Sequence, residues 1–146
     1  MVGGGRRRAS VPSLSSVVDL PLMVNGGRWT EARFRSFIIS ALRGAHGKWG
    51  VKHDCKAEAR VSRGLYECAE CHTIGAATLP PKEGNKRRRN NAAVDHINPV
   101  VEPEVGFVDW NTYIERMFLE AEGYQVLCDT CHSAKTAEER TRRKKK

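Results

Sequence analysis

The segments Cys-Ala-Glu-Cys at residues 68–71 and Cys-Asp-Thr-Cys-His at residues 128–132 decide how this chain folds. Two Cys-x-x-Cys pairs supply four thiolates, the ligand set of a closed tetrahedral zinc site. Such a site would hold the Asp95-His96 segment, which lies between the pairs, against the segment of His132. A structural zinc is therefore expected on Cys68, Cys71, Cys128 and Cys131.

The size and composition of the chain favour one small domain whose core needs support. The chain has 146 residues and an apolar fraction of 40%, and a small core of this kind is well served by a bound metal. Residues 1–16 lack the continuous apolar stretch of a secretory signal. Disulfides are therefore not expected, and the two Cys-x-x-Cys pairs are expected to bind metal. Cys55 has no knuckle partner and is expected to be a small, half-buried residue.

Basic residues are clustered at 6–8, 86–89 and 140–146, and the formal net charge is +8. Solvation alone would explain any one cluster, but three clusters beside a metal core favour a polyanionic partner, most simply DNA. A membrane partner is not expected, because no apolar stretch reaches the ~18 residues of a membrane span. The expected DNA contacts are Lys86, Arg87, Arg88, Arg89, Lys135, Arg142 and Arg143.

Local patterns divide the chain into four parts. Residues 1–29 are rich in Gly, Ser and Arg and are expected to be flexible, with translation starting at Met1 or at Met23. Residues 30–64 are expected to form a helical segment that supports the core or contacts DNA. Residues 65–139 hold the cysteine pairs and form the main domain, and residues 140–146 form a basic tail.

The expected elements are short, and together they predict a small α+β domain with a zinc-stapled ββα core, flanking helices and basic tails. Strands are expected at residues 65–67, 93–95 and 125–127, and a basic loop at residues 73–92. Helices are expected from Thr30 to Gly44, from residue 54 to 63, from Asp109 to Gly123, and from Asp129 or Thr130 onward. The apolar stripes of the first and third helices are expected to be core.

The ββα arrangement predicts a second metal site. Asp95 and His132 would approach one another and offer a carboxylate and an imidazole to a divalent cation, with open positions for water and phosphate oxygens. His96, unligated beside that cation, could take a proton from water, which predicts phosphodiester hydrolysis. A zinc-ligand or core role for His96, and plain polar roles for Asp95 and His132, remain alternatives. His72 is expected to face solvent or substrate, and His46 and His53 to lie at the surface.

Several motifs resemble those of HNH endonucleases of tailed bacteriophages. They are Val-Asp-His-Ile-Asn-Pro-Val at 94–100, Gly-Tyr-Gln-Val-Leu-Cys at 123–128 and Cys131-His132. The resemblance implies a nuclease domain at 65–139, with His96 as general base, Asp95 and His132 holding Mg²⁺ or Mn²⁺, and structural Zn²⁺ on the four cysteines. In one departure, Gly123 stands where the family usually has Asn, and Asn111 and Gln125 are candidates to replace it.

The resemblance also implies a biological setting. It suggests a phage-encoded enzyme that cuts DNA in the host bacterial cytoplasm, with the phage terminase large subunit as a candidate partner. One alternative is a non-catalytic, zinc-stabilised DNA-binding accessory protein. Another is a virion structural protein whose zinc core only folds it.

Overall fold

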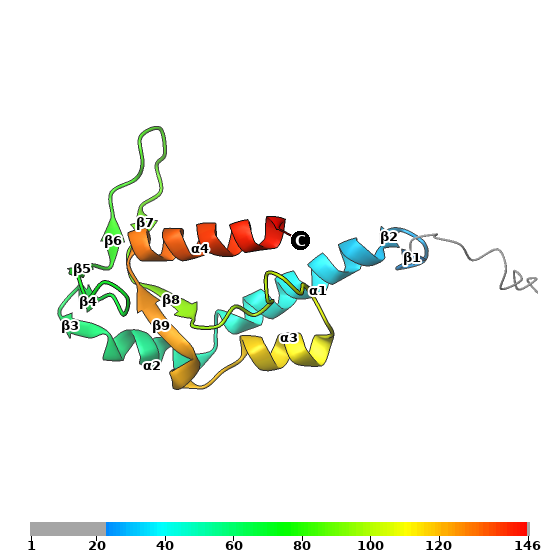
Figure 1. The fold of residues 1–146 in the computed structure, drawn as a ribbon, viewed down its shortest axis with the longest axis horizontal. Helices are drawn as coiled ribbons and strands as arrows, with labels where there is room; N and C mark the ends of the chain where they lie inside the picture. Colours follow the sequence, from blue (N-terminus) through cyan, green and yellow to red (C-terminus); the bar gives the residue numbers. More distant parts are fainter. Residues whose placement is uncertain (1–22, 146) are drawn as a thin grey trace, which may run out of the picture. The chain divides into compact units, whose positions relative to one another are not determined.

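The structure is a computed structural model that describes residues 23–145, so the expected flexible segment lies outside the described residues as far as residue 22. The described part combines helices α1–α4 with short antiparallel strands, β1–β9 (Figure 1), which confirms the α+β class. The chain divides into two compact units between Ala41 and Leu42. The predicted domain boundaries at residues 29, 64 and 139 remain predictions.

The first unit contains a small hairpin and most of α1. Strands β1 (Met23–Val24) and β2 (Trp29–Thr30) pair and lead into α1 (Glu31–His46). Thr30 caps this helix as predicted, because its Oγ1 accepts a hydrogen bond from Arg33 N at 3.2 Å. The helix continues past the predicted end at Gly44. Phe37, predicted to be core, is 54% exposed, since the hairpin of its own unit is too small to cover the apolar stripe.

The second unit begins with α2 (Gly50–Glu58) and a three-stranded sheet of β3 (Arg60–Ser62), β4 (Leu65–Glu67) and β5 (Ile74–Ala76). The prediction of a helix at 54–63 is wrong at both ends. The helix starts earlier, and the chain after Ala59 extends into β3 and turns back at Gly64. This turn uses a positive φ of 74° that glycine adopts without strain.

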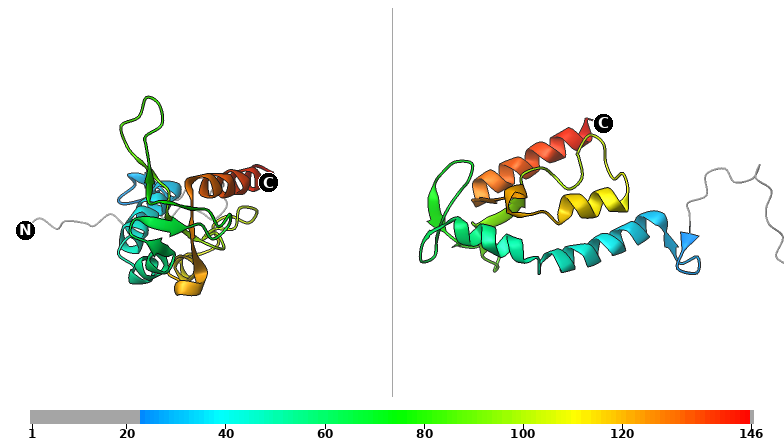
Figure 2. Two further views of the ribbon diagram at one scale, coloured as in Figure 1. Left: turned by 90° about the vertical axis from the view of Figure 1, so that its left-hand side faces the viewer. Right: turned by 90° about the horizontal axis from the view of Figure 1, so that it is seen from below.

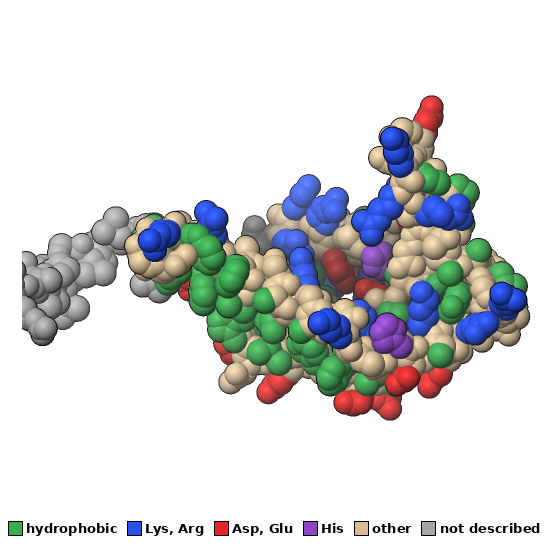
Figure 3. Space-filling view, turned by 180° about the vertical axis from the view of Figure 1, so that it is seen from behind, with side chains coloured by type: hydrophobic (Ala, Val, Ile, Leu, Met, Phe, Trp, Pro, Cys, Tyr) green, Lys and Arg blue, Asp and Glu red, His purple; other side chains and the backbone are tan. Residues whose placement is uncertain are grey.

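Residues 73–92 were predicted to be a basic loop, but they form strands as well. Besides β5, strands β6 (Thr78–Leu79) and β7 (Arg89–Asn90) pair at the base of a projecting hairpin. Lys and Arg side chains gather along this projection (Figure 3). The basic cluster at 86–89 thus lies on a hairpin whose base is the β6–β7 pair, which local propensity alone did not indicate.

The centre of the second unit is the pair β8 (Ala93–His96) and β9 (Tyr124–Leu127). Their antiparallel register places Asp95 opposite Gln125 and His96 opposite Tyr124. This ribbon lies between α2 and α4 (Figures 1 and 2). Its inner residues pack with Cys55 of α2 in a small core cluster of Cys55, Ala92, Tyr124 and Val126.

Helix α3 (Trp110–Met117) is shorter than predicted, and α4 (Asp129–Lys144) is longer. Asp109 caps α3 as predicted, with its Oδ1 accepting from Thr112 N at 2.7 Å. The helix ends at Met117 rather than at Gly123, and a 3-10 turn, η2 (Ala121–Gly123), follows.

Helix α4 differs from its prediction at both ends. Its N-cap is Cys128, whose Sγ accepts from Cys131 N at 3.5 Å, and not Asp129 or Thr130. The helix also continues through most of the predicted basic tail, as far as Lys144.

Candidate functional site

The four paired cysteines come together, as the sequence predicted. The Sγ atoms of Cys68, Cys71, Cys128 and Cys131 all lie within 4.8 Å of one another. Cys71 Sγ and Cys128 Sγ are 3.8 Å apart, which matches the roughly 3.8 Å between two sulfurs that each lie about 2.3 Å from a tetrahedral zinc. The cluster could therefore hold a metal such as zinc.

Backbone hydrogen bonds place the two knuckles against each other. Cys68 N donates to Thr73 O at 3.1 Å, and His72 N donates to Cys68 O at 2.9 Å, which closes the first knuckle. Ala69 N then donates to Val126 O at 2.8 Å. This bond ties the first knuckle to β9, whose end leads directly into the second knuckle.

The electrostatics of the cluster suit a dication. Hydrogen bonds from the Thr73 hydroxyl and backbone N–H lower the pKa of Cys71 to about 6. The hydrogen bond with Cys128, followed by burial, raises the pKa of Cys131 to about 12. A bound dication would favour the deprotonated form of each thiol and let all four sulfurs ligate as thiolates. Cys55 lies apart in the core, and burial raises the pKa of its thiol.

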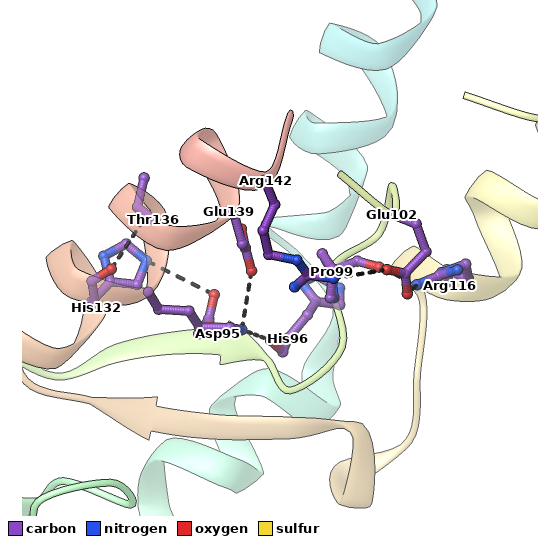
Figure 4. A network of polar contacts seen from close by, with 10 residues as sticks. Asp95, His96, Pro99, Glu102, Arg116, His132, Thr136, Glu139 and Arg142 are labelled. Atoms are coloured by element: carbon purple, nitrogen blue, oxygen red, sulfur yellow. Dashed lines mark hydrogen bonds and ion pairs between the residues drawn. The ribbon is translucent and has the colours of Figure 1, made fainter. Parts of the chain in front are cut away.

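Asp95 and His132 also meet, and they do so across the ββα unit (Figure 4). Asp95 Oδ1 of β8 lies 3.9 Å from His132 Nε2 of α4. The other carboxylate oxygen, Oδ2, accepts a hydrogen bond from Lys135 Nζ, which also donates to the carbonyl oxygen of His96. Glu139, one turn further along α4, lies 3.7 Å from the same ammonium group.

The separation of Asp95 and His132 bears on whether one cation could reach both. Two ligands that each lie about 2.1 Å from one cation can be at most roughly 4.2 Å apart, and the 3.9 Å between Asp95 Oδ1 and His132 Nε2 is within this limit. The side chain of Asp95 is 20% exposed and that of His132 is 44% exposed, so both are accessible to solvent. Lys135 Nζ contacts the other carboxylate oxygen, Oδ2.

His96 faces different neighbours from Asp95, as side-chain alternation along a strand requires. Its Nε2 lies 2.7 Å from the carbonyl oxygen of Met117. A carbonyl oxygen can only accept, so His96 Nε2 carries the proton. In the neutral ring the lone pair consequently lies on Nδ1.

Gly123 occupies the place of the Asn that the HNH pattern leads one to expect. Its backbone oxygen accepts a hydrogen bond from Ile97 N at 3.0 Å, which fixes the chain directly after His96. Gln125, one candidate replacement, lies opposite Asp95 on β9, and Asn111, the other, lies near the start of α3. The backbone of Gly123 therefore makes the link between β9 and the His96 loop.

The predicted DNA contacts fall into two groups. Lys86, Arg87, Arg88 and Arg143 are exposed. The other three are engaged within the protein: Arg89 Nη1 lies 2.7 Å from Asp129 Oδ2, Arg142 Nη2 lies 2.9 Å from Glu104 Oε2, and Lys135 contacts Asp95. For these three side chains, the structure offers an intramolecular role that charge clustering did not indicate.

One buried polar residue, His46, was missed in the sequence. His46 was predicted to lie at the surface, but it is only 8% exposed, and its Nε2 lies 2.9 Å from the Tyr124 hydroxyl. A helix continued beyond Gly44 would have placed His46 on the face of the apolar stripe, which is the signal that was available. His72 is exposed, and its Nδ1 lies 3.1 Å from Glu67 Oε1.

Comparison of the chain with protein-family models, curated proteins and solved structures gives no match. Within residues 23–145, no helix has both the length and the apolar character needed to cross a membrane.

Proposed function

We propose that this protein is a metal-dependent DNA endonuclease that hydrolyses phosphodiester bonds, by nicking or by cutting both strands, through an HNH-type ββα-metal site. The observation that carries the proposal is the 3.9 Å approach of Asp95 Oδ1 to His132 Nε2, beside a histidine whose Nε2 is already committed to a carbonyl. A DNA-binding module without catalysis would need neither arrangement.

Each residue has a role in the proposed reaction. Asp95 and His132 would hold Mg²⁺ or Mn²⁺, and the bound ion would offset negative charge on the phosphate and on the leaving 3′ oxygen. His96 Nδ1 accepts a proton from water while the water oxygen bonds to phosphorus and the P–O3′ bond breaks. Lys135 holds the Asp95 carboxylate and the His96 carbonyl in place from α4.

The cysteine cluster is assigned a structural role in the proposed enzyme. A zinc on Cys68, Cys71, Cys128 and Cys131 would have no open position for substrate. It would instead fix the first turn of α4 against the first knuckle, since Cys131 is the residue before His132. The catalytic ion site and the zinc site would thus share one helix without sharing a ligand.

DNA phosphates are the proposed targets of the exposed basic side chains, which are Lys86, Arg87 and Arg88 on the β6–β7 projection and Arg143 on α4. Arg89 and Arg142 would support these elements through their ion pairs with Asp129 and Glu104. Binding of this kind is salt-dependent and reads little sequence.

A second candidate function is a non-catalytic, zinc-stabilised DNA-binding protein. The contact of Lys135 with Asp95 Oδ2 favours it, because an internal cation already compensates the carboxylate. Mg²⁺ or Mn²⁺ binding discriminates the two candidates, since only the nuclease requires a divalent cation at Asp95.

The proposed setting is phage growth inside a bacterium, with cutting linked to DNA packaging and the terminase large subunit as partner. A small enzyme that mainly contacts phosphates would gain its target site from such a partner. A pull-down with that subunit, coupled to cleavage assays with and without it, tests this. Absence of association and an unchanged cut pattern would refute the packaging role and leave the nuclease assignment intact.

Plasmid nicking with Mg²⁺ or Mn²⁺, compared with EDTA, tests the nuclease proposal. His96→Ala is expected to abolish cleavage while Mn²⁺ and DNA still bind, because a base acts in the transition state. Asp95→Ala and His132→Ala are expected to lose both cleavage and tight Mn²⁺ binding. His53→Ala, at an exposed position of α2, is the control and should cut like wild type. A His96→Ala variant that still cuts DNA would refute the assignment.

A further inference from the structure

The end of α3 leaves the backbone carbonyl of Met117 available to His96. The last four carbonyls of a helix have no intrahelical partner, and Met117 is the final residue of α3. Two side chains donate to this one oxygen: His96 Nε2 at 2.7 Å and the Tyr124 hydroxyl at 2.7 Å. Both lone pairs of the Met117 oxygen are thereby used.

The hydroxyl of Tyr124 has its own position fixed from two further sides. It accepts a hydrogen bond from Leu119 N at 3.1 Å. His46 Nε2 lies 2.9 Å from it. Because the single hydroxyl proton of Tyr124 goes to Met117, His46 Nε2 must be the donor in this contact. Tyr124 is 5% exposed and His46 is 8% exposed, so water does not compete for these bonds.

His46 Nδ1 faces the ammonium group of Lys52, which can only donate, so this nitrogen bears a lone pair and the ring is neutral. Lys52 Nζ lies 3.5 Å from this nitrogen and can donate to it. Burial, followed by the charges of Lys52 and His96, lowers the pKa of His46 to about 4. Because Nδ1 of the neutral ring faces Lys52, the single ring proton of His46 lies on Nε2, where it is donated to Tyr124.

Ring packing completes the support of His96. The rings of His46 and His96 are stacked, with centroids 5.1 Å apart and planes at 23°. The Tyr124 ring lies 4.9 Å from the His96 ring. The imidazole of His96 is thus held at Nε2 by the Met117 carbonyl, stacked on the His46 ring and packed against the tilted Tyr124 ring, which leaves it little rotational freedom.

We propose that Tyr124 and His46 are positioning residues for His96. Tyr124 orients the Met117 carbonyl that receives the His96 Nε2 proton, and His46 orients Tyr124 while stacking on His96. Together they select the ring tautomer that has its lone pair on Nδ1. The consequence for catalysis rests on the proposed function, in which Nδ1 accepts a proton from water, but the tautomer itself does not.

Imidazole ¹⁵N NMR of the full-length protein tests the proposal directly. At a pH about two units above the ordinary histidine pKa of about 6.5, wild-type His96 is expected to show a protonated Nε2 and a bare Nδ1. Tyr124→Phe removes one hydroxyl, and is expected to give a mixture of both tautomers. If the protein cuts DNA, kcat should fall about 10-fold to 100-fold with KM unchanged. Tyr113→Phe is the matched control, because Tyr113 is also 5% exposed and lies outside this network.

A second pair of variants decides the matter if Tyr124→Phe does not fold. His46→Gln keeps an N–H donor for Tyr124, whereas His46→Phe keeps a stacking ring without a donor. The Gln variant is expected to retain the wild-type His96 tautomer and the Phe variant to lose it. The proposal is overturned if His96 keeps the wild-type tautomer in both His46→Phe and Tyr124→Phe. If Tyr124→Phe does not fold, a wild-type tautomer in His46→Phe alone overturns it. A wild type that cuts no DNA would refute the nuclease assignment, while the NMR result would still support or overturn the positioning.

Discussion

Gly123 lies directly against Leu119: a Cβ placed on Gly123 would come within 2.5 Å of Leu119 Cδ1 and 2.8 Å of Leu119 Cβ. Both atoms would have to move, and Leu119 is held in place because its carbonyl accepts from Trp49 Nε1 at 2.7 Å. The Asn of the HNH pattern therefore cannot be accommodated at this position without repacking. The bracing of the His96 loop is done here by the Gly123 backbone.

Introducing the Asn that the HNH resemblance leads one to expect should destabilise the protein. Gly123→Asn should lower the free energy of unfolding by about 1–3 kcal/mol, because it overpacks the Leu119 contact. Urea unfolding at neutral pH measures this as a lower midpoint. Gly44→Asn is the control: nothing lies within 4 Å of a Cβ at Gly44, so its effect should stay within about 0.5 kcal/mol. Equal midpoints for the two variants would show that Leu119 does not constrain Gly123.

Zinc is expected at one atom per chain, and the fold is expected to depend on it. In the double variant Cys68→Ser/Cys128→Ser, half of the ligand set is gone, so zinc and cooperative thermal unfolding should both be lost. Metal analysis and calorimetry measure the two effects. Cys55→Ser should keep its zinc, because Cys55 belongs to the core cluster and not to the four-cysteine group. Native thermal stability in the double variant would argue against a structural metal.

The exposed residues of the β6–β7 projection are expected to contribute to non-specific DNA affinity. Replacing Lys86, Arg87 and Arg88 together by Gln should reduce the slope of log affinity against log salt by up to about 2.7, at roughly 0.9 per phosphate contact. Fluorescence anisotropy over a salt series measures the slope.

Arg89→Gln is the comparison for this triple variant, because Arg89 is paired with Asp129 at 2.7 Å. It should destabilise the fold by about 1 kcal/mol and leave the slope nearly unchanged. The prediction fails if the triple variant keeps the wild-type slope.

Stability is expected to fall between pH 6.5 and pH 4 because of His46. The folded-state pKa of His46 is lowered from 6.5 to about 4, so over this range the unfolded chain binds a proton that the folded protein does not. The contribution of His46 to the free energy of unfolding is complete above pH 6.5 and is lost as the pH falls to 4. The loss is on the order of 3 kcal/mol. The groups that face His46 are Lys52 of α2, His96 of β8 and Tyr124 of β9.

Urea midpoints at several pH values check this expectation. His46→Gln should lose less stability than wild type over the same interval, whereas His53→Gln, at an exposed site, should follow wild type. Parallel pH curves for wild type and His46→Gln would contradict the burial of a neutral His46.

The parts of the fold that sequence reasoning predicted are those with strong local signals. Paired Cys-x-x-Cys spacing indicated the four-sulfur cluster, and the caps at Thr30 and Asp109 indicated two helix starts. The approach of Asp95 to His132 followed from the predicted order of two strands and a helix. Each of these features depends on neighbours in sequence or on a ligand set that only one geometry satisfies.

The remaining features depend on tertiary contacts. The apolar pattern of residues 110–121 continues past Met117, yet the helix stops there because the Tyr124 hydroxyl donates to Met117 O and accepts from Leu119 N. Nothing in the local pattern indicates that bond. Likewise, the sequence does not distinguish Lys135 from the other basic residues. Its position on α4, one turn after His132, allows its ammonium group to contact Asp95.

The distance in sequence between the two knuckles has an evolutionary consequence. A metal on the four cysteines would close residues 72–127 into a ring that contains Asp95, His96, α3 and the β6–β7 projection. The entropy of closing such a ring changes only with the logarithm of its length, by about 0.6 kcal/mol for each doubling. Homologous chains could therefore gain or lose residues at the tip of the projection at little cost to stability. Length variation among relatives should concentrate there, while the spacing from Tyr124 to His132 stays constant.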